Sequence, residues 1–240
     1  MRTLVNILKG IYQYVIFFPV MWLTTTLTAL ITILFFPWKN AYWLNRVQAY
    51  WARLYCWCWA IPVSVSGEEH IRKGQSYVFV ANHQSAWDVF LVYGWLPVIF
   101  KWMLKKELRR IPVIGTACVA CGHIFVDRRH LKAAAASLKA VEKQLHDGIS
   151  TVIFPEGTRT EDGSVGRFKR GAFQIAMDLK LPVIPLSISG CFEVYPKHRH
   201  LISSHPIHLH IGEEIDLSQF DTTEEAMNYV REKMIEYVHA

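Results

Sequence analysis

The sequence predicts an α/β fold in which a mixed, mainly parallel sheet is flanked by helices and preceded by a membrane-anchoring helical segment. Short apolar runs alternate with helix-like patterns from Val63 onward, which is the order that parallel strands joined by helices require. Ahead of Val63 lies a long run without charged residues, which is typical of a membrane anchor. Charged residues make up only 19% of the chain, which excludes a disordered protein. We therefore divide the 240 residues into an anchor, residues 1–62, and an α/β domain, residues 63–240.

The positive charge of the chain is concentrated in the anchor. The net charge of the whole chain is +6. The anchor contains no acidic residue, and its basic residues are Arg2, Lys9, Lys39, Arg46 and Arg53. Basic residues beside many aromatic rings are typical of a segment held at an anionic membrane surface. Because the rest of the chain is nearly neutral, we expect no nucleic-acid partner.

Two helices are predicted in the anchor. No charge occurs between Lys9 and Lys39, and about 20 apolar residues are enough to cross a bilayer. Residues 40–62 are rich in Trp and Tyr but contain two arginines, which predicts an amphipathic helix lying at the membrane interface. Two arrangements fit: residues 11–36 cross the membrane as one helix, or the two helices form a hairpin within one leaflet. Burial of both in a soluble core is less favoured, because core helices rarely exceed about 25 residues.

The α/β domain shows short Val- and Ile-rich runs bounded by turn residues, which predict strands at 77–81, 98–101, 124–126, 150–154, 183–189 and 207–211. Helical spacing predicts a helix that begins near Ser85, and others at 131–146, 171–179 and 223–238. Gly148 is placed to cap the second of these helices, and Pro185 predicts a bulge or an edge in its strand. Ligands of such sheets bind beyond the carboxyl ends of the strands.

The five cysteines predict no disulfide framework, because their number is odd and they are sparse, which fits a reducing compartment. Cys118 and Cys121, followed by His123, have the spacing of half a zinc site. No second pair has a matching spacing. We therefore expect small core residues here and no metal ion.

The first candidate site is His83 with Asp88, directly after the strand at 77–81. Histidine is the usual proton acceptor near neutral pH, and a carboxylate can fix its tautomer. Residues five apart do not share a helix face. The pair therefore meets only if His83 lies in the strand-to-helix turn and Asp88 in the first helical turn. The alternative is that Ser85 and Asp88 only cap the helix.

The second candidate site follows the strand at 150–154 and contains Pro155, Glu156, Gly157, Thr158 and Arg159. Arg159 can hold a phosphate through two parallel hydrogen bonds, and Glu156 can orient a hydroxyl group or that arginine. The alternative is a surface turn with a Glu–Arg pair. Lys105 and Arg109 are four residues apart, so on a helix they would share a face that a phosphate-sized anion could contact.

Taken together, these motifs resemble the glycerolipid acyltransferases of the 1-acylglycerol-3-phosphate type. The resemblance rests on His83-x4-Asp88, the HX4D motif, and on Phe154-Pro-Glu-Gly-Thr-Arg159. Further blocks occur in the same order, from Lys105-x-Glu107-Leu108 to Val183-Ile-Pro-Leu186. The form Asn-His-Gln-Ser around His83 is similar to the lysophosphatidate enzymes. The resemblance covers about residues 65–215 and implies the glycerolipid acyltransferase fold.

The resemblance implies that an acyl chain passes from acyl-CoA or acyl-carrier protein to the sn-2 hydroxyl of 1-acyl-sn-glycerol 3-phosphate. The product is phosphatidic acid, for phospholipid biosynthesis. His83 is then the general base and Asp88 orients it. The implied substrate-binding residues are Glu156, Gly157, Thr158, Arg159 and Lys105.

The implied partners are the phospholipid bilayer at the cytoplasmic face of the cell membrane, lysophosphatidic acid, and the acyl donor as co-substrate. No cofactor is implied. Two alternatives stay open: an acyltransferase for another lyso-lipid acceptor, such as a lysophospholipid or an acylated amino acid, and a non-catalytic membrane lipid-binding protein. A lipase or esterase is excluded by the absence of a Gly-x-Ser-x-Gly motif.

Overall fold

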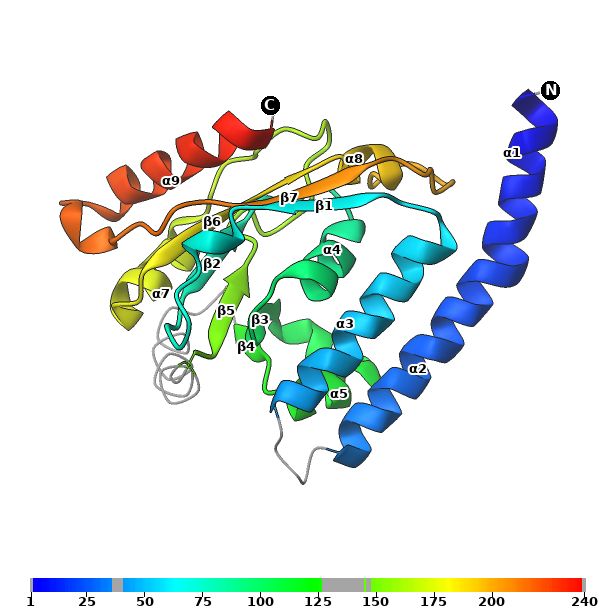
Figure 1. Cartoon of the computed structure of the whole chain (residues 1–240), viewed down its shortest axis with the longest axis horizontal. Helices are drawn as coiled ribbons and strands as arrows, with labels where there is room; N and C mark the ends of the chain where they lie inside the picture. The colour runs from blue at the N-terminus through cyan, green and yellow to red at the C-terminus, as the bar shows by residue number, and fades with distance from the viewer. Residues whose placement is uncertain (1, 36–40, 127–144, 146–147, 239–240) are drawn as a thin grey trace.

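The computed structural model describes residues 2–35, 41–126, 145 and 148–238. Among these residues, seven strands form one sheet in the order β1-β7-β6-β2-β5-β3-β4 (Figure 1). The strands are β1 (Val63–Ser66), β2 (Val78–Ala81), β3 (Phe100–Lys105), β4 (Ile124–Val126), β5 (Ser150–Ile153), β6 (Val183–Ser189) and β7 (Ile207–Ile211). Every neighbouring pair is parallel except β6 with β7. The predicted mixed, mainly parallel sheet is confirmed.

Helices cover both faces of the sheet (Figure 1). The α-helices are α1 (Arg2–Ile11), α2 (Phe18–Phe35), α3 (Ala41–Cys58), α4 (Trp87–Trp95), α5 (Ile114–Ala120), α7 (Arg170–Leu179), α8 (Cys191–Val194) and α9 (Thr223–Val238). The shorter segments are the π-helix η1 (Tyr12–Phe17) and the 3-10 helices η3 (Glu68–His70), η4 (Lys106–Arg110) and η5 (Leu217–Gln219).

The alternation of side chains along β2 divides the core into two layers. Phe79 and Ala81 face the cluster that contains α3 and α4, whereas Val78 and Val80 face the cluster of α7 and α9. Successive strand residues point to opposite faces of a sheet, so a strand covered on both faces is apolar throughout. This explains why the central strands appear in the sequence as unbroken apolar runs.

The N-terminal segment packs onto the α/β domain. Helices α1 and α2, joined by η1, form one helix over Thr3–Phe35 that is long and apolar enough to cross a membrane. Only 17% of its most apolar 18-residue stretch is buried. Phe17 of this helix and Tyr55 of α3 nevertheless lie in the core layer that contains α3 and α4. The N-terminal segment and the α/β domain thus share the core layer that contains α3 and α4, and the division at residue 62 stays a prediction.

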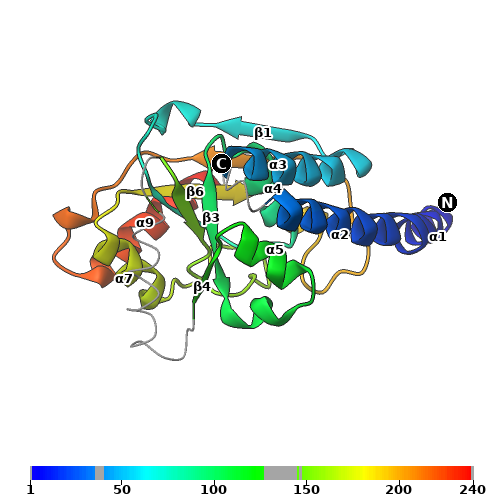
Figure 2. The same ribbon diagram turned by 90° about the horizontal axis from the view of Figure 1, so that it is seen from below.

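Gln13 fastens the N-terminal helix to a late part of the chain. Its side chain is fully buried, donates to the carbonyl of His200 (2.7 Å) and accepts from the backbone N–H of Ile202 (2.8 Å). Farther along the same helix, Thr32 is also buried, where α2 packs against α5. The helix therefore lies along the domain and contacts it near both of these positions (Figure 2).

Several local predictions need comment. Lys105 is extended and ends β3, while Arg109 lies in a 3-10 helix, so the prediction that the two share a helix face was wrong.

Pro185 is not on an edge, because β6 lies between β7 and β2. The register does shift beside it: Pro185 accepts from the N–H of Gly212 but Val183 pairs with Ile215, so the extra residue lies in the partner segment 212–215 and not in β6 as predicted. The helix predicted at 131–146 lies outside the described residues.

We predict that Asn82→Ala destabilises the fold. The buried Asn82 side chain donates to the carbonyl of Ile188 (2.9 Å) and accepts from its N–H (2.7 Å), joining the end of β2 to β6. Alanine leaves two buried backbone groups unpaired, which costs about 2–4 kcal/mol. Thermal unfolding in detergent should show a midpoint lower by several degrees, whereas the exposed control Asn228→Ala should leave it unchanged. An unchanged midpoint in Asn82→Ala would contradict the prediction.

Candidate active site

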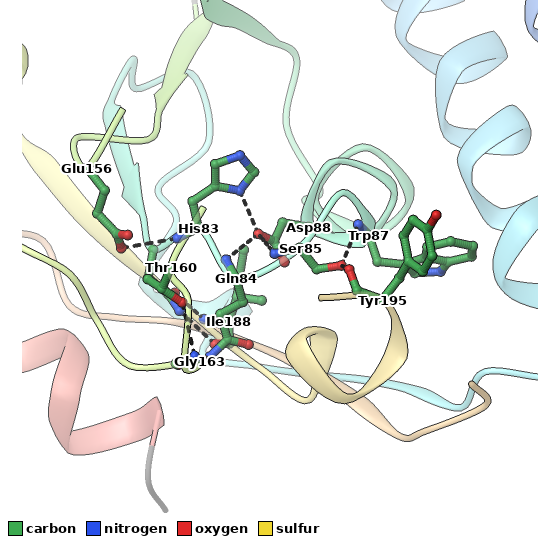
Figure 3. A network of polar contacts seen from close by, with 11 residues as sticks. His83, Gln84, Ser85, Trp87, Asp88, Glu156, Thr160, Gly163, Ile188 and Tyr195 are labelled. Atoms are coloured by element: carbon green, nitrogen blue, oxygen red, sulfur yellow. Dashed lines mark hydrogen bonds and ion pairs between the residues drawn. The ribbon is translucent and has the colours of Figure 1, made fainter. Parts of the chain in front are cut away.

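His83 and Asp88 meet at the carboxyl end of β2. His83 lies in the turn after the strand, Asp88 lies in the first turn of α4, and Nδ1 of His83 is 2.7 Å from Oδ2 of Asp88 (Figure 3). A carboxylate only accepts hydrogen bonds, so Nδ1 carries the proton and Nε2 is left with a free lone pair. The His83 side chain is 18% exposed, whereas that of Asp88 is fully buried. The arrangement is the one that the turn geometry required.

Asp88 both caps helix α4 and orients His83. Its Oδ2 also accepts the backbone N–H groups of Gln84 (2.7 Å) and Ser85 (2.8 Å) (Figure 3). These donors and the positive end of the helix stabilise the buried negative charge. The capping interpretation and the catalytic interpretation of the motif therefore describe the same contacts.

An aromatic stack fixes the plane of the His83 ring. Phe154, at the end of β5, lies parallel to the imidazole with ring centroids 4.0 Å apart, and Trp102 stacks on the other side of Phe154 at 5.2 Å. The hydrogen bond to Asp88 fixes the direction of Nδ1, and the stack fixes the tilt of the ring. Sequence analysis missed this role of Phe154, because nothing local distinguishes it from a core residue.

Glu156 is buried behind His83. Its Oε1 accepts the backbone N–H of His83 (3.2 Å), and only 5% of the residue is exposed (Figure 3). Burial raises the pKa of this carboxyl group to about 7, although hydrogen bonds from the His83 and Gly166 backbones and the charge of Arg231 act in the opposite direction. The observed contacts of Glu156 are thus with the backbones of His83 and Gly166, and contact with substrate stays a prediction.

Arg231 of α9 is a residue that sequence analysis missed. Its guanidinium donates to the carbonyl groups of Val165 (2.7 Å) and Gly166 (2.9 Å), in the loop that covers Glu156. Gly166 lies so close that a Cβ atom there would be 2.9 Å from Oε2 of Glu156. The C-terminal helix therefore supports the turn that holds His83 through this loop, although it contains no recognisable motif.

The other predicted site residues lie around the same turn. Gly157 has a φ of 75°, which favours glycine, and Thr158 and Arg159 follow it. Arg159 is half-buried and lies near Tyr195. Burial and the neighbouring Tyr14 raise the pKa of Tyr195, and the positive charge of Arg159 offsets part of that rise. Lys105 is exposed and forms an ion pair with Glu107 (3.8 Å).

A cavity of about 450 Å³ adjoins His83. His83, Gly157 and Lys105 line it together with mostly apolar side chains of α2, α3, α4, β3 and α5. The N-terminal helices thus form part of its wall.

His123, Cys118 and Cys121 also line this cavity. Nδ1 of His123 accepts the Trp102 N–H (3.2 Å), so its Nε2–H donates to the Tyr93 hydroxyl (2.7 Å). Burial lowers the pKa of His123 to about 3. Within the described ranges, no group of three His, Cys, Asp or Glu side chains is arranged to hold a metal ion.

Comparisons with known proteins agree with this geometry. The family model described as Acyltransferase matches residues 62–189. The 1-acyl-sn-glycerol-3-phosphate acyltransferase of Limnanthes douglasii is 29% identical over 206 residues, covering 84% of this chain and 72% of the relative. The protein of the same name from Borreliella burgdorferi is 30% identical over 183 residues, covering 75% and 72%. The crystal structure of the 1-acyl-sn-glycerophosphate acyltransferase PlsC from Thermotoga maritima superposes with a TM-score of 0.81 at 28% identity, covering 100% of this chain and 97% of that one.

We predict a pH dependence of stability that originates in Glu156. Its folded pKa of about 7 lies above the ordinary value of 4.5, so the native state keeps a proton that the unfolded state has lost. The contribution of Glu156 to the free energy of unfolding is therefore complete below pH 4.5. It declines by about 3 kcal/mol as the pH rises to about 7. Thermal unfolding across this range should show the decline in the wild type and a flatter profile in Glu156→Gln. Parallel profiles would contradict this assignment.

Proposed function

Because the chain belongs to the acyltransferase family, we propose that it transfers an acyl chain from a thioester donor to the sn-2 hydroxyl of 1-acyl-sn-glycerol 3-phosphate. The product is phosphatidic acid. The proposal rests chiefly on one observation: a histidine oriented by a buried carboxylate lies on the wall of an apolar cavity at the carboxyl end of the sheet. Both relatives described above are named 1-acyl-sn-glycerol-3-phosphate acyltransferase.

His83 acts as the general base. Its Nε2 takes the proton of the acceptor hydroxyl, while Nδ1–H remains bonded to Asp88. The acceptor oxygen forms a bond to the thioester carbonyl carbon, and the carbon–sulfur bond breaks. The departing thiolate takes the proton from the imidazolium, so the histidine returns to its starting state. General base catalysis of this kind contributes about 10²–10⁴ in rate.

Asp88 stabilises the imidazolium that forms during the reaction. Its carboxylate is held by the backbone N–H groups of Gln84 and Ser85, so it cannot turn away from His83. The aromatic stack on Phe154 holds the ring in the same plane before and after protonation. Little reorganisation is needed at the moment of reaction, which is where preorganised sites gain rate.

The apolar cavity receives an acyl chain. Each buried methylene group contributes about 0.8 kcal/mol, so a long chain is held without specific polar contacts. Arg159 and Lys105 bind the acceptor phosphate, and acyl-CoA or acyl-carrier protein serves as the donor.

The N-terminal segment holds the enzyme in one leaflet at the cytoplasmic face. Gln13 and Thr32 are about 28 Å apart along a helix, which is almost the full hydrocarbon thickness. Both are nevertheless buried against the same domain. A domain cannot lie on both sides of a bilayer, so this contact pattern supports the hairpin arrangement over a crossing helix.

The catalytic pair can be tested by His83→Ala and Asp88→Asn. Both should lower phosphatidate formation from 1-acylglycerol 3-phosphate and a thioester donor by about 10²–10⁴, because the base or its orientation is lost. The matched control is His205→Ala, which removes an exposed histidine and should retain full activity. Membrane binding should persist in all three variants. Full activity in His83→Ala would show that another group is the base.

Arg159→Met tests the phosphate contact. We expect the KM for 1-acylglycerol 3-phosphate to rise about 10–100-fold, because a hydrogen-bonded charge is lost, while Arg159→Lys restores part of the affinity. With 1-acylglycerol as acceptor, which has no phosphate, wild type and Arg159→Met should be equal. An equal loss with both acceptors would assign Arg159 a structural role and reopen the identity of the acceptor.

A further inference from the structure

A surface beside the cavity carries exposed residues to which the proposed reaction assigns no role. We define the η4–α5 shoulder as residues 106–119. Its exposed apolar side chains are Leu108, Ile111, Ile114 and Val119, each exposed by 37–42%. Its exposed basic residues are Lys106, Arg109 and Arg110. The basic side chains thus lie at 106–110, next to Leu108, Ile111 and one exposed acidic residue, Glu107, and the other two apolar side chains follow on α5.

The shoulder is closely packed along its backbone and contains a strained turn. A Cβ atom at Gly115 would be 2.3 Å from the carbonyl oxygen of Arg109, so α5 and η4 are in close backbone contact. Val113 has a φ of 63°, and the N–H of Ile114 donates to the carbonyl of Pro112 (2.7 Å), which makes a γ-turn with a β-branched residue at its centre. Such strain is typical of segments held in a fixed shape for function. Here it leaves Ile111 and Ile114 exposed.

The shoulder lies between the apolar N-terminal helix and the cavity. Helix α5 packs against α2 (Figure 2), whose residues Leu27, Leu30 and Leu34 are more than half exposed. Leu108 and Ile114 also line the cavity that contains His83. These two side chains are therefore at once part of the exposed surface and part of the cavity rim.

We propose that the η4–α5 shoulder is a second membrane contact, which places its apolar side chains among lipid chains and its basic residues on anionic headgroups. The acceptor lipid then reaches His83 from the membrane across Leu108 and Ile114. The path of the acceptor rests on the proposed function, whereas the membrane contact does not.

A lipid surface explains the composition better than a soluble partner. An acidic carrier protein or the phosphates of a nucleotide would be bound by the basic residues alone, and would leave four exposed apolar side chains unexplained. Interfacial segments combine the two features, with basic residues at headgroup depth and apolar residues below them. The shoulder also continues the exposed apolar surface of α2.

The contact can be measured directly on the full-length protein in vesicles. A nitroxide label at Ile111→Cys should be accessible to oxygen and protected from a water-soluble nickel complex in vesicles of phosphatidylglycerol and phosphatidylcholine. The same label at Tyr229→Cys, an equally exposed position on α9, should show the opposite pattern, and the native cysteines contribute equally to both. A label at Ile111 that stays in water would overturn the proposal.

Kinetics test the path of the acceptor. Ile111→Glu and Arg109→Glu/Arg110→Glu should reduce turnover of long-chain 1-acylglycerol 3-phosphate in anionic vesicles about tenfold or more. Turnover of a short-chain, monomeric acceptor in solution should remain at the wild-type level, as should both activities of the control Tyr229→Glu. Equal losses with both acceptors would overturn the proposed path of the acceptor. A raised KM for an acyl-carrier-protein donor, with an unchanged rate in vesicles, would instead assign the surface to the acyl-carrier protein. Inactive wild type with every acceptor would instead refute the proposed function and leave the labelling result standing.

Discussion

The hydrogen bond between His83 and Asp88 is the constraint around which the surrounding structure is organised. It requires a sharp turn between a buried strand and a helix, and each neighbouring element contributes one contact that holds this turn. Asn82 joins it to β6, Glu156 binds its backbone from the loop after β5, and Phe154 lies flat against the imidazole. The central position of β2 brings these residues together, because β5 and β6 are its two neighbours and all three strands end at the same edge.

The sequence predicts those features that have a local pattern. The strands were recognisable because a doubly covered sheet requires continuous apolar runs, and the His83–Asp88 geometry followed from the number of residues between them. Arg231 and Phe154 could not be predicted, because their roles depend on tertiary contacts with Gly166 and His83. The error at Lys105 has a related cause: a spacing of four implies a shared face only in an α-helix, and here the strand continues to that residue.

The anchor and the catalytic domain are joined more closely than the sequence indicates. Composition changes sharply near Val63, which favours two independent parts. In the structure, Phe17 and Trp59 form an edge-to-face pair, and Phe17 also stacks near Trp87 at the start of α4. Trp87 lies one residue before Asp88, whose carboxylate accepts the hydrogen bond from His83. Aromatic residues that would serve as interfacial anchors in an isolated helix therefore also pack beneath the active site.

The buried Gln13 has a consequence for the biosynthesis of the protein. Its partners, His200 and Ile202, are made nearly 190 residues later, so at ordinary synthesis rates the N-terminal helix exists for about 10–40 s before they emerge. During that interval an apolar helix with an unpaired polar side chain is present without its domain. The lipid bilayer or a chaperone must shelter it, and docking of the helix reports that the chain has been made as far as Ile202, just before β7, the last strand in the sequence.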